Sequence, residues 1–332
     1  MNKYLGILFA TLVGLAGCGE ESAKSKAHEQ PKQAIEQIKS STVAKSQPKE
    51  TLETSKQAGK DYTPALWKVE HGDSTSYLFG SIHMGDASMF PLPDVVNQAF
   101  ESTDALAVEI DMGNINQLEM AQTLQQLAID PNTTLESMLK KDTWEKYNEF
   151  CEETKTPCGM FNTFEPWLAA VSLESLNMKK SGYTEKYGID MYFLGQARDK
   201  KEIIALETVN SQLSMLDSMP LYIQDAFLLS IVTREGDGIE ELVQAWKTGN
   251  VEEYIENSFE EADTVGLSSE EYEQLLDLLL YKRNKSMAEG LAKQFEQGKN
   301  VFAVVGAAHY GGDKSINHYL QELGYKVERV TY

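Results

Sequence analysis

Histidine and cysteine are scarce in this sequence, and the common catalytic motifs are missing from it. The 332 residues include five histidines and three cysteines. There is no phosphate-binding P-loop, no GxGxxG after a strand, no GxSxG nucleophile elbow and no HExxH helix. Any functional site must therefore be assembled from a few dispersed residues.

Basic residues are also few compared with acidic ones. The chain has 30 Lys and Arg against 51 Asp and Glu, which gives a net charge of −21. Residues 1–18 hold one Lys, and residues 19–60 hold eight Lys and six Glu, so residues 61–332 carry −24. A domain this acidic is repelled by phosphate backbones and anionic lipid, which argues against nucleic acid as a partner.

The longest early apolar stretch, residues 4–17, is too short to span a bilayer comfortably and suits the core of a secretion signal. It follows Lys3 and ends in Leu-Ala-Gly before Cys18, which resembles a bacterial lipobox. We expect a signal peptide over 1–18 and lipid on Cys18; the alternative is an ordinary signal with an incidental cysteine. Gly19 after Cys18 favours the outer membrane in a Gram-negative host, with the domain facing the periplasm or the cell exterior.

Residues 19–60 contain no aromatic residue and consist mostly of Lys, Glu, Gln, Ser and Ala. Such a segment cannot bury enough apolar surface to fold. We interpret it as a flexible tether that holds the domain, residues 61–332, roughly 35 Å from the membrane.

Apart from Cys18, the remaining cysteines are Cys151 and Cys158. An even number of cysteines in an exported protein favours a disulfide. The alternatives are two free thiols or a pair of ligands for a soft metal, although C-x6-C is not a usual zinc spacing.

Apolar runs predict strands that alternate with long helical stretches, which indicates an α/β fold with some α+β character. The first two strands are expected to form a hairpin around a turn at residues 71–74. Runs 104–111 and 201–208 have the uninterrupted apolar core of strands buried on both faces. The predicted strands are 65–70, 75–79, 104–111, 201–208, 300–305 and 325–331, and helices are predicted over most of 113–200 and 211–297, with 269–297 as one helix.

Four of these strands end in a side chain that can bind a metal or move a proton: His83, Glu109, Glu207 and His309. Both histidines belong to Gly-x-x-His units, which begin at Gly80 and Gly306. In α/β folds, sites collect at the carboxyl ends of strands.

Two imidazoles and two carboxylates suit a divalent transition metal such as manganese, cobalt or zinc. A glutamate that stays unbound can act as general base on a metal-bound water, which is the chemistry of a hydrolase. Any one of these residues alone is more often structural or solvated, so the prediction depends on four strands sharing the feature. His71, in a turn, is expected to be solvated rather than catalytic, and His318, on a helix, to be solvated or packed rather than catalytic.

The sequence resembles the TraB/GumN family, which is related to the TIKI metalloproteases. The resemblance covers about 62–332. It depends on the two Gly-x-x-His units and on four other segments in the same order: Val108-Glu109-Ile110-Asp111, Tyr187-Gly188-Ile189-Asp190, Leu206-Glu207-Thr208 and Arg283-Asn284. It implies a central mixed sheet surrounded by helices, with a helical insertion.

The resemblance also implies metal-dependent proteolysis of a peptide or secreted protein, with His83, His309 and Glu109 as the principal groups. Arg283 and Asn284 would lie near the site, and Arg283 could hold a carboxylate or an oxyanion. Relatives often place an acid before Arg-Asn, whereas this chain has Lys282.

Two other functions stay open at this point. Related hydrolases use a similar His/Glu arrangement without metal, with one histidine as general base. The protein could instead be a lipoprotein that binds haem, a metal or a peptide pheromone without chemistry, and in the haem case His83 or His309 could be an axial ligand.

Overall fold

The computed structural model describes residues 62–234, 239–260 and 266–331. The predicted signal peptide, Cys18 and the tether lie outside these residues. Within the described part, no single helix is long and apolar enough to cross a membrane, and one pair of helices reaches that length only across a bend of 101°.

The core of the molecule is a six-stranded mixed sheet, as predicted. The spatial order is β4-β3-β5-β2-β1-β6. The first four strands in this order are parallel to one another, and β1 pairs antiparallel with both β2 and β6. The strands are β1 (Leu66–His71), β2 (Ser74–Ser81), β3 (Ala105–Val108), β4 (Glu202–Ala205), β5 (Val301–Gly306) and β6 (Lys326–Arg329).

The predicted β1–β2 hairpin is confirmed, because His71 pairs with Ser74 across the turn. The prediction that 104–111 is buried holds for all of β3. The prediction that 201–208 is buried on both faces was wrong, since β4 has exposed ends and half-buried Ile203 and Ile204. The reason is topological: β4 is the last strand of the sheet and has a neighbour on one side only.

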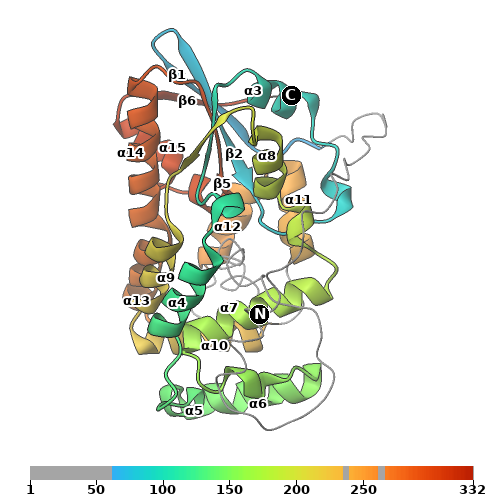
Figure 1. Ribbon diagram of the computed structural model, residues 1–332, viewed down its shortest axis with the longest axis vertical. Helices are drawn as coiled ribbons and strands as arrows, with labels where there is room; N and C mark the ends of the chain where they lie inside the picture. The colour runs from blue at the N-terminus through green and yellow to red at the C-terminus, as the bar shows by residue number, and fades with distance from the viewer. Residues whose placement is uncertain (1–61, 235–238, 261–265, 332) are drawn as a thin grey trace.

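Helices cover both faces of the sheet (Figure 1). On one face, Phe193 of α8 packs against Phe79 of β2 and Phe302 of β5. On the other, Phe295 of α14 stacks on His71. These aromatic contacts hold the central strands between two layers. The helices that flank the sheet are α3 (Asp94–Glu101), α8 (Ile189–Ala197), α11 (Ile239–Thr248), α14 (Lys282–Glu296) and α15 (Ile316–Glu322).

The predicted helical insertion lies below the sheet in Figure 1, at the end where the parallel strands finish. It is drawn from two chain segments, one between β3 and β4 and one between β4 and β5. Its helices are α4 (Gln117–Leu127), α5 (Leu135–Met138), α6 (Lys141–Thr154), α7 (Pro166–Lys180), α9 (Val209–Asp217), α10 (Leu221–Val232) and α13 (Ser269–Leu276), and α12 (Val251–Glu260) lies nearer the sheet.

The predicted helix over 269–297 is continuous as far as Glu296, but its middle is π-helical rather than α-helical. Helix α13 passes into a π-helical turn, Asp277–Tyr281, before α14 begins at Lys282. A π turn adds a residue to the helical repeat and rotates everything after it, which is why such turns recur at functional sites. Here Arg283 and Asn284 follow immediately.

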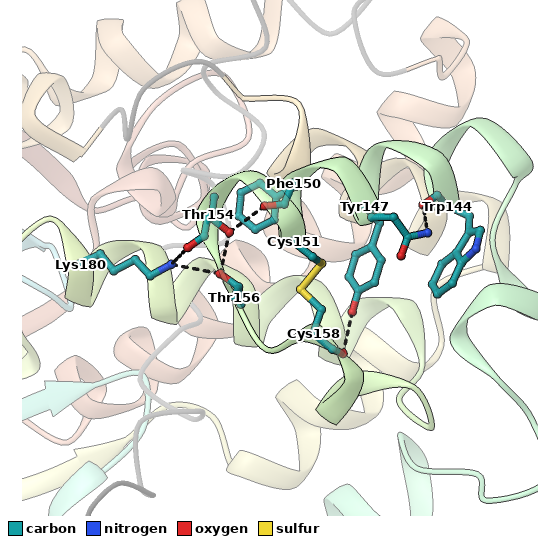
Figure 2. Close-up of a disulfide and its surroundings, with 9 residues drawn as sticks. Trp144, Tyr147, Phe150, Cys151, Thr154, Thr156, Cys158 and Lys180 are labelled. Atoms are coloured by element: carbon teal, nitrogen blue, oxygen red, sulfur yellow. Dashed lines mark hydrogen bonds between the residues drawn. A yellow bond between two sulfur atoms is a disulfide. The ribbon is translucent and has the colours of Figure 1, made fainter. Parts of the chain in front are cut away.

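Cys151 and Cys158 are joined by a disulfide at the end of α6 (Figure 2). The bridge closes a tight loop in which Lys155 adopts a left-handed conformation, with φ of 54°. The Tyr147 hydroxyl donates to the Cys158 carbonyl at 3.1 Å, and Lys180 of α7 donates to Thr156 at 3.0 Å. The loop is thus fastened both to α6 and to the neighbouring α7.

Candidate active site

The sheet brings the four predicted strand ends to one edge. Strands β2 and β5 are adjacent and parallel, with Ser81 beside Gly306, so the loops that carry His83 and His309 leave the sheet together. Strand β3 lies on the other side of β5, and β4 lies beside β3. The two Gly-x-x-His units are therefore on the same side of the molecule, as the site prediction required.

His83 is held by a carboxylate that the sequence places 107 residues away. Its Nδ1 lies 2.6 Å from Oδ2 of Asp190, whose other oxygen accepts from the Ser81 hydroxyl at 2.7 Å. Burial alone would raise the pKa of Asp190, but His83 and the two hydrogen bonds keep that pKa below its ordinary value. Asp190 is thus an anion that fixes the orientation of the ring.

The loop carrying His83 is held by the residues that lead into α8 and by the first residues of that helix. The amide of Ile189 donates to the Ile82 carbonyl at 3.0 Å. A Cβ added to Gly188 would lie 2.2 Å from the His83 carbonyl oxygen, so only glycine allows this approach. The Tyr187–Asp190 segment therefore both clamps His83 and supplies its partner.

His309 is completely buried in a short 3-10 turn, Ala307–Tyr310, directly after β5. Its Nδ1 lies 2.5 Å from Oδ1 of Asn284, whose amide nitrogen donates to the Lys314 carbonyl at 2.7 Å. Its Nε2 has no hydrogen-bond partner in the described part of the chain and lies 3.8 Å from Oε1 of Glu109. Burial, together with the charges of Arg283 and His83, holds the pKa of His309 well below 6.5, so the ring is neutral.

Arg283 joins the two glutamates in a buried clamp. Its Nη2 donates to Glu109 at 2.7 Å and to Glu207 at 2.6 Å, and its Nε donates to Glu207 at 2.9 Å. Its Nη1 donates to the Leu279 carbonyl within the π turn. The prediction that Arg283 could hold a carboxylate fits this geometry, with the carboxylates supplied by the protein itself.

Gln212 of α9 completes the clamp, and the sequence interpretation missed it. Its side-chain amide donates to Glu109 at 3.2 Å and to Glu207 at 2.9 Å. The available signal was a glutamine in the first turn of a helix whose N-cap, Thr208, directly follows the strand-terminal Glu207. Ser81 was also missed, although it lies inside the first Gly-x-x-His unit.

Both carboxylate oxygens of Glu109 therefore accept hydrogen bonds from the protein. Its Oε1 accepts from the Gly306 amide at 2.7 Å, and its Oε2 accepts from Arg283 and Gln212. Burial raises its pKa, while the charge of Arg283 opposes that rise.

Gly80 allows the turn that carries His309 to approach β2. A Cβ added to Gly80 would lie 3.2 Å from the Ala307 Cβ, so glycine permits this close packing.

The predicted metal ligands His83, His309 and Glu109 do not form a three-ligand set here. Both oxygens of Glu109 are occupied by donors from the protein, one of them a guanidinium that repels a cation. Within residues 62–234, 239–260 and 266–331, no group of three His, Cys, Asp or Glu side chains could hold a metal ion. The two imidazoles suit a metal by their chemistry, but the third ligand does not.

His71 was expected to be solvated, and that prediction was wrong. It ends β1, its Nε2 lies 2.9 Å from the Ser76 hydroxyl, and its ring stacks on Phe295 with 4.5 Å between centroids. His318 lies on α15, where its side chain is 41% exposed and its Nε2 lies 3.4 Å from Oε1 of Glu322. Neither histidine belongs to the site.

Fold and site together define a buried His/Glu/Arg cluster at the carboxyl edge of a mixed sheet. Residues 65–329 match the TraB/PrgY/gumN family, and the chain belongs to that family. It is similar to the uncharacterized protein YbaP of Shigella flexneri, with 26% identity over 268 residues that cover 79% of this chain and 94% of the relative. The same figures hold for the uncharacterized protein YbaP of Escherichia coli K12. No solved structure matches.

Proposed function

We propose that this protein is a hydrolase that cleaves a peptide or a secreted protein. The observation that carries the proposal is the pairing of the two imidazoles at one sheet edge, each with its Nδ1 held by a side chain from a distant segment. Any buried histidine needs hydrogen-bond partners, but Nε2 of His309 has none in the described residues, and a histidine that moves protons must present a defined ring nitrogen.

His83 is the general base in this proposal. Asp190 accepts from Nδ1, so the neutral ring carries its lone pair on Nε2. When Nε2 takes a proton from an attacking water, the Asp190 carboxylate stabilises the imidazolium that forms. His83 then returns the proton to the leaving amine. Its side chain is 16% exposed, compared with none for His309, so a substrate reaches His83 first.

His309 orients the water in this proposal. Because the ring proton of His309 is on Nδ1, which donates a hydrogen bond to Asn284, Nε2 can only accept a hydrogen bond. A water held by two acceptor nitrogens, one from each ring, keeps its oxygen lone pair for attack. Burial and the positive charge of Arg283 lower the pKa of His309 and keep its ring neutral.

Metal dependence on manganese, cobalt or zinc is a second form of the same proposal. His83 and His309 would each supply a nitrogen, and Glu109 would have to exchange Gln212 or Arg283 for the metal. The two forms differ in one measurement, which is whether a chelator abolishes hydrolysis and one of the three metals restores it.

Location and anchoring are part of the proposal. The protein would be attached through lipid on Cys18 to the outer membrane, and peptides rather than nucleic acids would be its substrates. Labelling with radioactive palmitate, lost in Cys18→Ser, tests the anchor separately from the chemistry.

The test of activity uses the full chain with a library of fluorogenic peptides. We expect cleavage by the wild type and at least a hundredfold loss in His83→Ala and Asp190→Asn, on the scale of removing a general base. His318→Ala is the matched control, because it removes a histidine that is 41% exposed and pairs with Glu322 rather than with a residue of the site. Cleavage that survives His83→Ala unchanged would exclude His83 as the base.

Binding without chemistry predicts different results in the same experiment. A haem carrier would show a Soret band on adding haem and no cleavage of any peptide. A pheromone-binding protein would retain peptides intact, with affinity that survives His309→Ala. Either result would overturn the hydrolase proposal.

A further inference from the structure

Glu185 lies beside the candidate site, and its Oε1 accepts no hydrogen bond from the residues that the structure describes. It begins the 3-10 turn Glu185–Tyr187, just before the Gly188 that touches the His83 carbonyl. Thr184 is tied to Gly85, two residues after His83, by hydrogen bonds of 3.0 and 2.9 Å in both directions. The turn is thus fixed against the loop that carries His83.

The carboxylate of Glu185 is not satisfied within the described part of the chain. Its Oε1 is buried and accepts no hydrogen bond there. Burial raises the pKa of Glu185, opposed by the charges of Lys179 and His83. Lys179 is exposed in the last turn of α7, and among the described residues it makes no ion pair with Glu185 within 4.0 Å. A buried carboxylate oxygen without a donor is costly.

The charge balance around the site leaves room for a cation. The neighbouring carboxylates are Asp190, Glu109 and Glu207, and the only guanidinium in contact with them in the described residues is Arg283, which is already bonded to both glutamates. A positively charged group arriving from outside would therefore meet a negative field.

From these observations we infer that Glu185 binds a positively charged nitrogen of the substrate and so selects cationic peptides. The nitrogen is either the substrate's terminal ammonium or a Lys or Arg side chain. This inference takes the location of the site from the proposed function, but it concerns recognition, and it can be tested without turnover. Glu185 would hold the substrate beside His83, with no part in the chemical step.

The test measures binding of matched octapeptides to the full-length protein by fluorescence anisotropy. The peptides differ in one side chain, Lys, Arg, norleucine or Glu, and each is prepared with a free and an acetylated N-terminus. We expect the wild type to bind a cationic peptide at least tenfold more tightly than its neutral counterpart. Glu185→Gln should lose that preference, with about 10- to 100-fold weaker binding of the cationic peptide and little change for the neutral one. Comparing the two series shows which nitrogen is recognised.

Glu145→Gln is the matched control. Glu145 lies on the surface of α6 and is 58% exposed, so its replacement removes the same charge without touching the site. Glu185→Gln should unfold at the same temperature as the wild type or above it, because burial makes the charged form unfavourable. If peptides are cleaved, Glu185→Gln should raise KM for cationic peptides and leave kcat unchanged.

The outcomes separate the inference from the proposed function. Cleavage or binding with no preference between Lys and norleucine, free and acetylated, would overturn the role of Glu185 while leaving the hydrolase intact. Cationic binding that depends on Glu185, without cleavage, would support the inference and count against the hydrolase. Equal loss of binding in Glu145→Gln would show a general charge effect and overturn the inference.

Discussion

Asn284 accepts a hydrogen bond from Nδ1 of His309, and this contact decides which ring nitrogen faces Glu109. The amide nitrogen of Asn284 donates to the Lys314 carbonyl, so its oxygen must point at the ring. His309 therefore carries its proton on Nδ1 and its lone pair on Nε2. A residue on α14, 25 positions away, thus sets the chemistry of a residue that follows β5.

We predict that nitrogen-15 NMR will show His309 neutral and protonated at Nδ1 at pH 6.5, because burial and nearby positive charge lower its pKa. Asn284→Leu removes the acceptor and should populate the other tautomer. Any hydrolytic activity should fall by about 10- to 100-fold, the scale found when the group supporting a ligand histidine is lost. Asn284→Asp keeps an acceptor and should retain the wild-type tautomer. An unchanged spectrum in Asn284→Leu would contradict this role.

Arg283→Met should destabilise the protein strongly, because it leaves the carboxylates of Glu109 and Glu207 buried without their counter-ion. We expect a loss of about 3–5 kcal/mol in the free energy of unfolding, measured with urea at pH 7.5. The neighbouring Lys282→Met is the control, since its pair with Asp277 is 67% and 43% exposed and should contribute less than about 1 kcal/mol. Lowering the pH until the two glutamates are protonated should reduce the difference in the free energy of unfolding between Arg283→Met and the wild type.

His71 should make stability depend on pH. Burial lowers its pKa in the folded protein below the ordinary 6.5. The unfolded chain therefore binds this proton more tightly, and stability rises with pH. The contribution is fully present above pH 6.5 and is lost as the pH falls below that value.

Unfolding by urea at pH 7.5 and pH 5 tests this prediction. His71→Phe keeps a ring against Phe295 and should lose less stability between the two pH values than the wild type does. His318→Phe, at a position where the side chain is 41% exposed, should behave like the wild type. A wild type and His71→Phe with the same pH dependence would contradict the role of His71.

The disulfide should stabilise the end of α6 through the short loop that it closes. Cys151→Ser combined with Cys158→Ser should lower the free energy of unfolding by about 2.5 kcal/mol, the loop-closure value for eight residues. Adding a reductant should destabilise the wild type by the same amount and leave the double variant unchanged. If the reductant also destabilised the double variant, some other group would be responsible.

Much of the fold could be predicted from local pattern. The strands are short apolar runs with turn residues between them, and their predicted positions agree with the structure to within about three residues at each end. Glycine and proline placed the helix ends, as at Gly182, whose positive φ of 87° follows α7. The burial of a strand could not be predicted from local pattern, because β4 has an apolar run like that of β3 and yet lies at the edge of the sheet.

For the candidate site, local sequence could indicate the strand-terminal groups but not their partners. His83, Glu109, Glu207 and His309 each follow an apolar strand, and that is visible along the chain. Gln212 and Glu185 do not directly follow an apolar strand, because Gln212 lies in the first turn of α9 and Glu185 in a 3-10 turn far from His83 in the sequence. Arg283, which donates a hydrogen bond to Glu109, follows a π turn that no residue pattern predicted.

By itself the sequence determined which residues end the parallel strands, since strand length and turn chemistry are local properties of the chain. Only the tertiary structure decided what each of those residues contacts. Hydrogen bonds to Asp190, Asn284 and Arg283 join segments 25 to 174 residues apart, and such distances are set by how the helices pack on the sheet. That packing fixes which ring nitrogen of His83 and of His309 carries the lone pair. It also places Glu109, a predicted metal ligand, in an ion pair with Arg283.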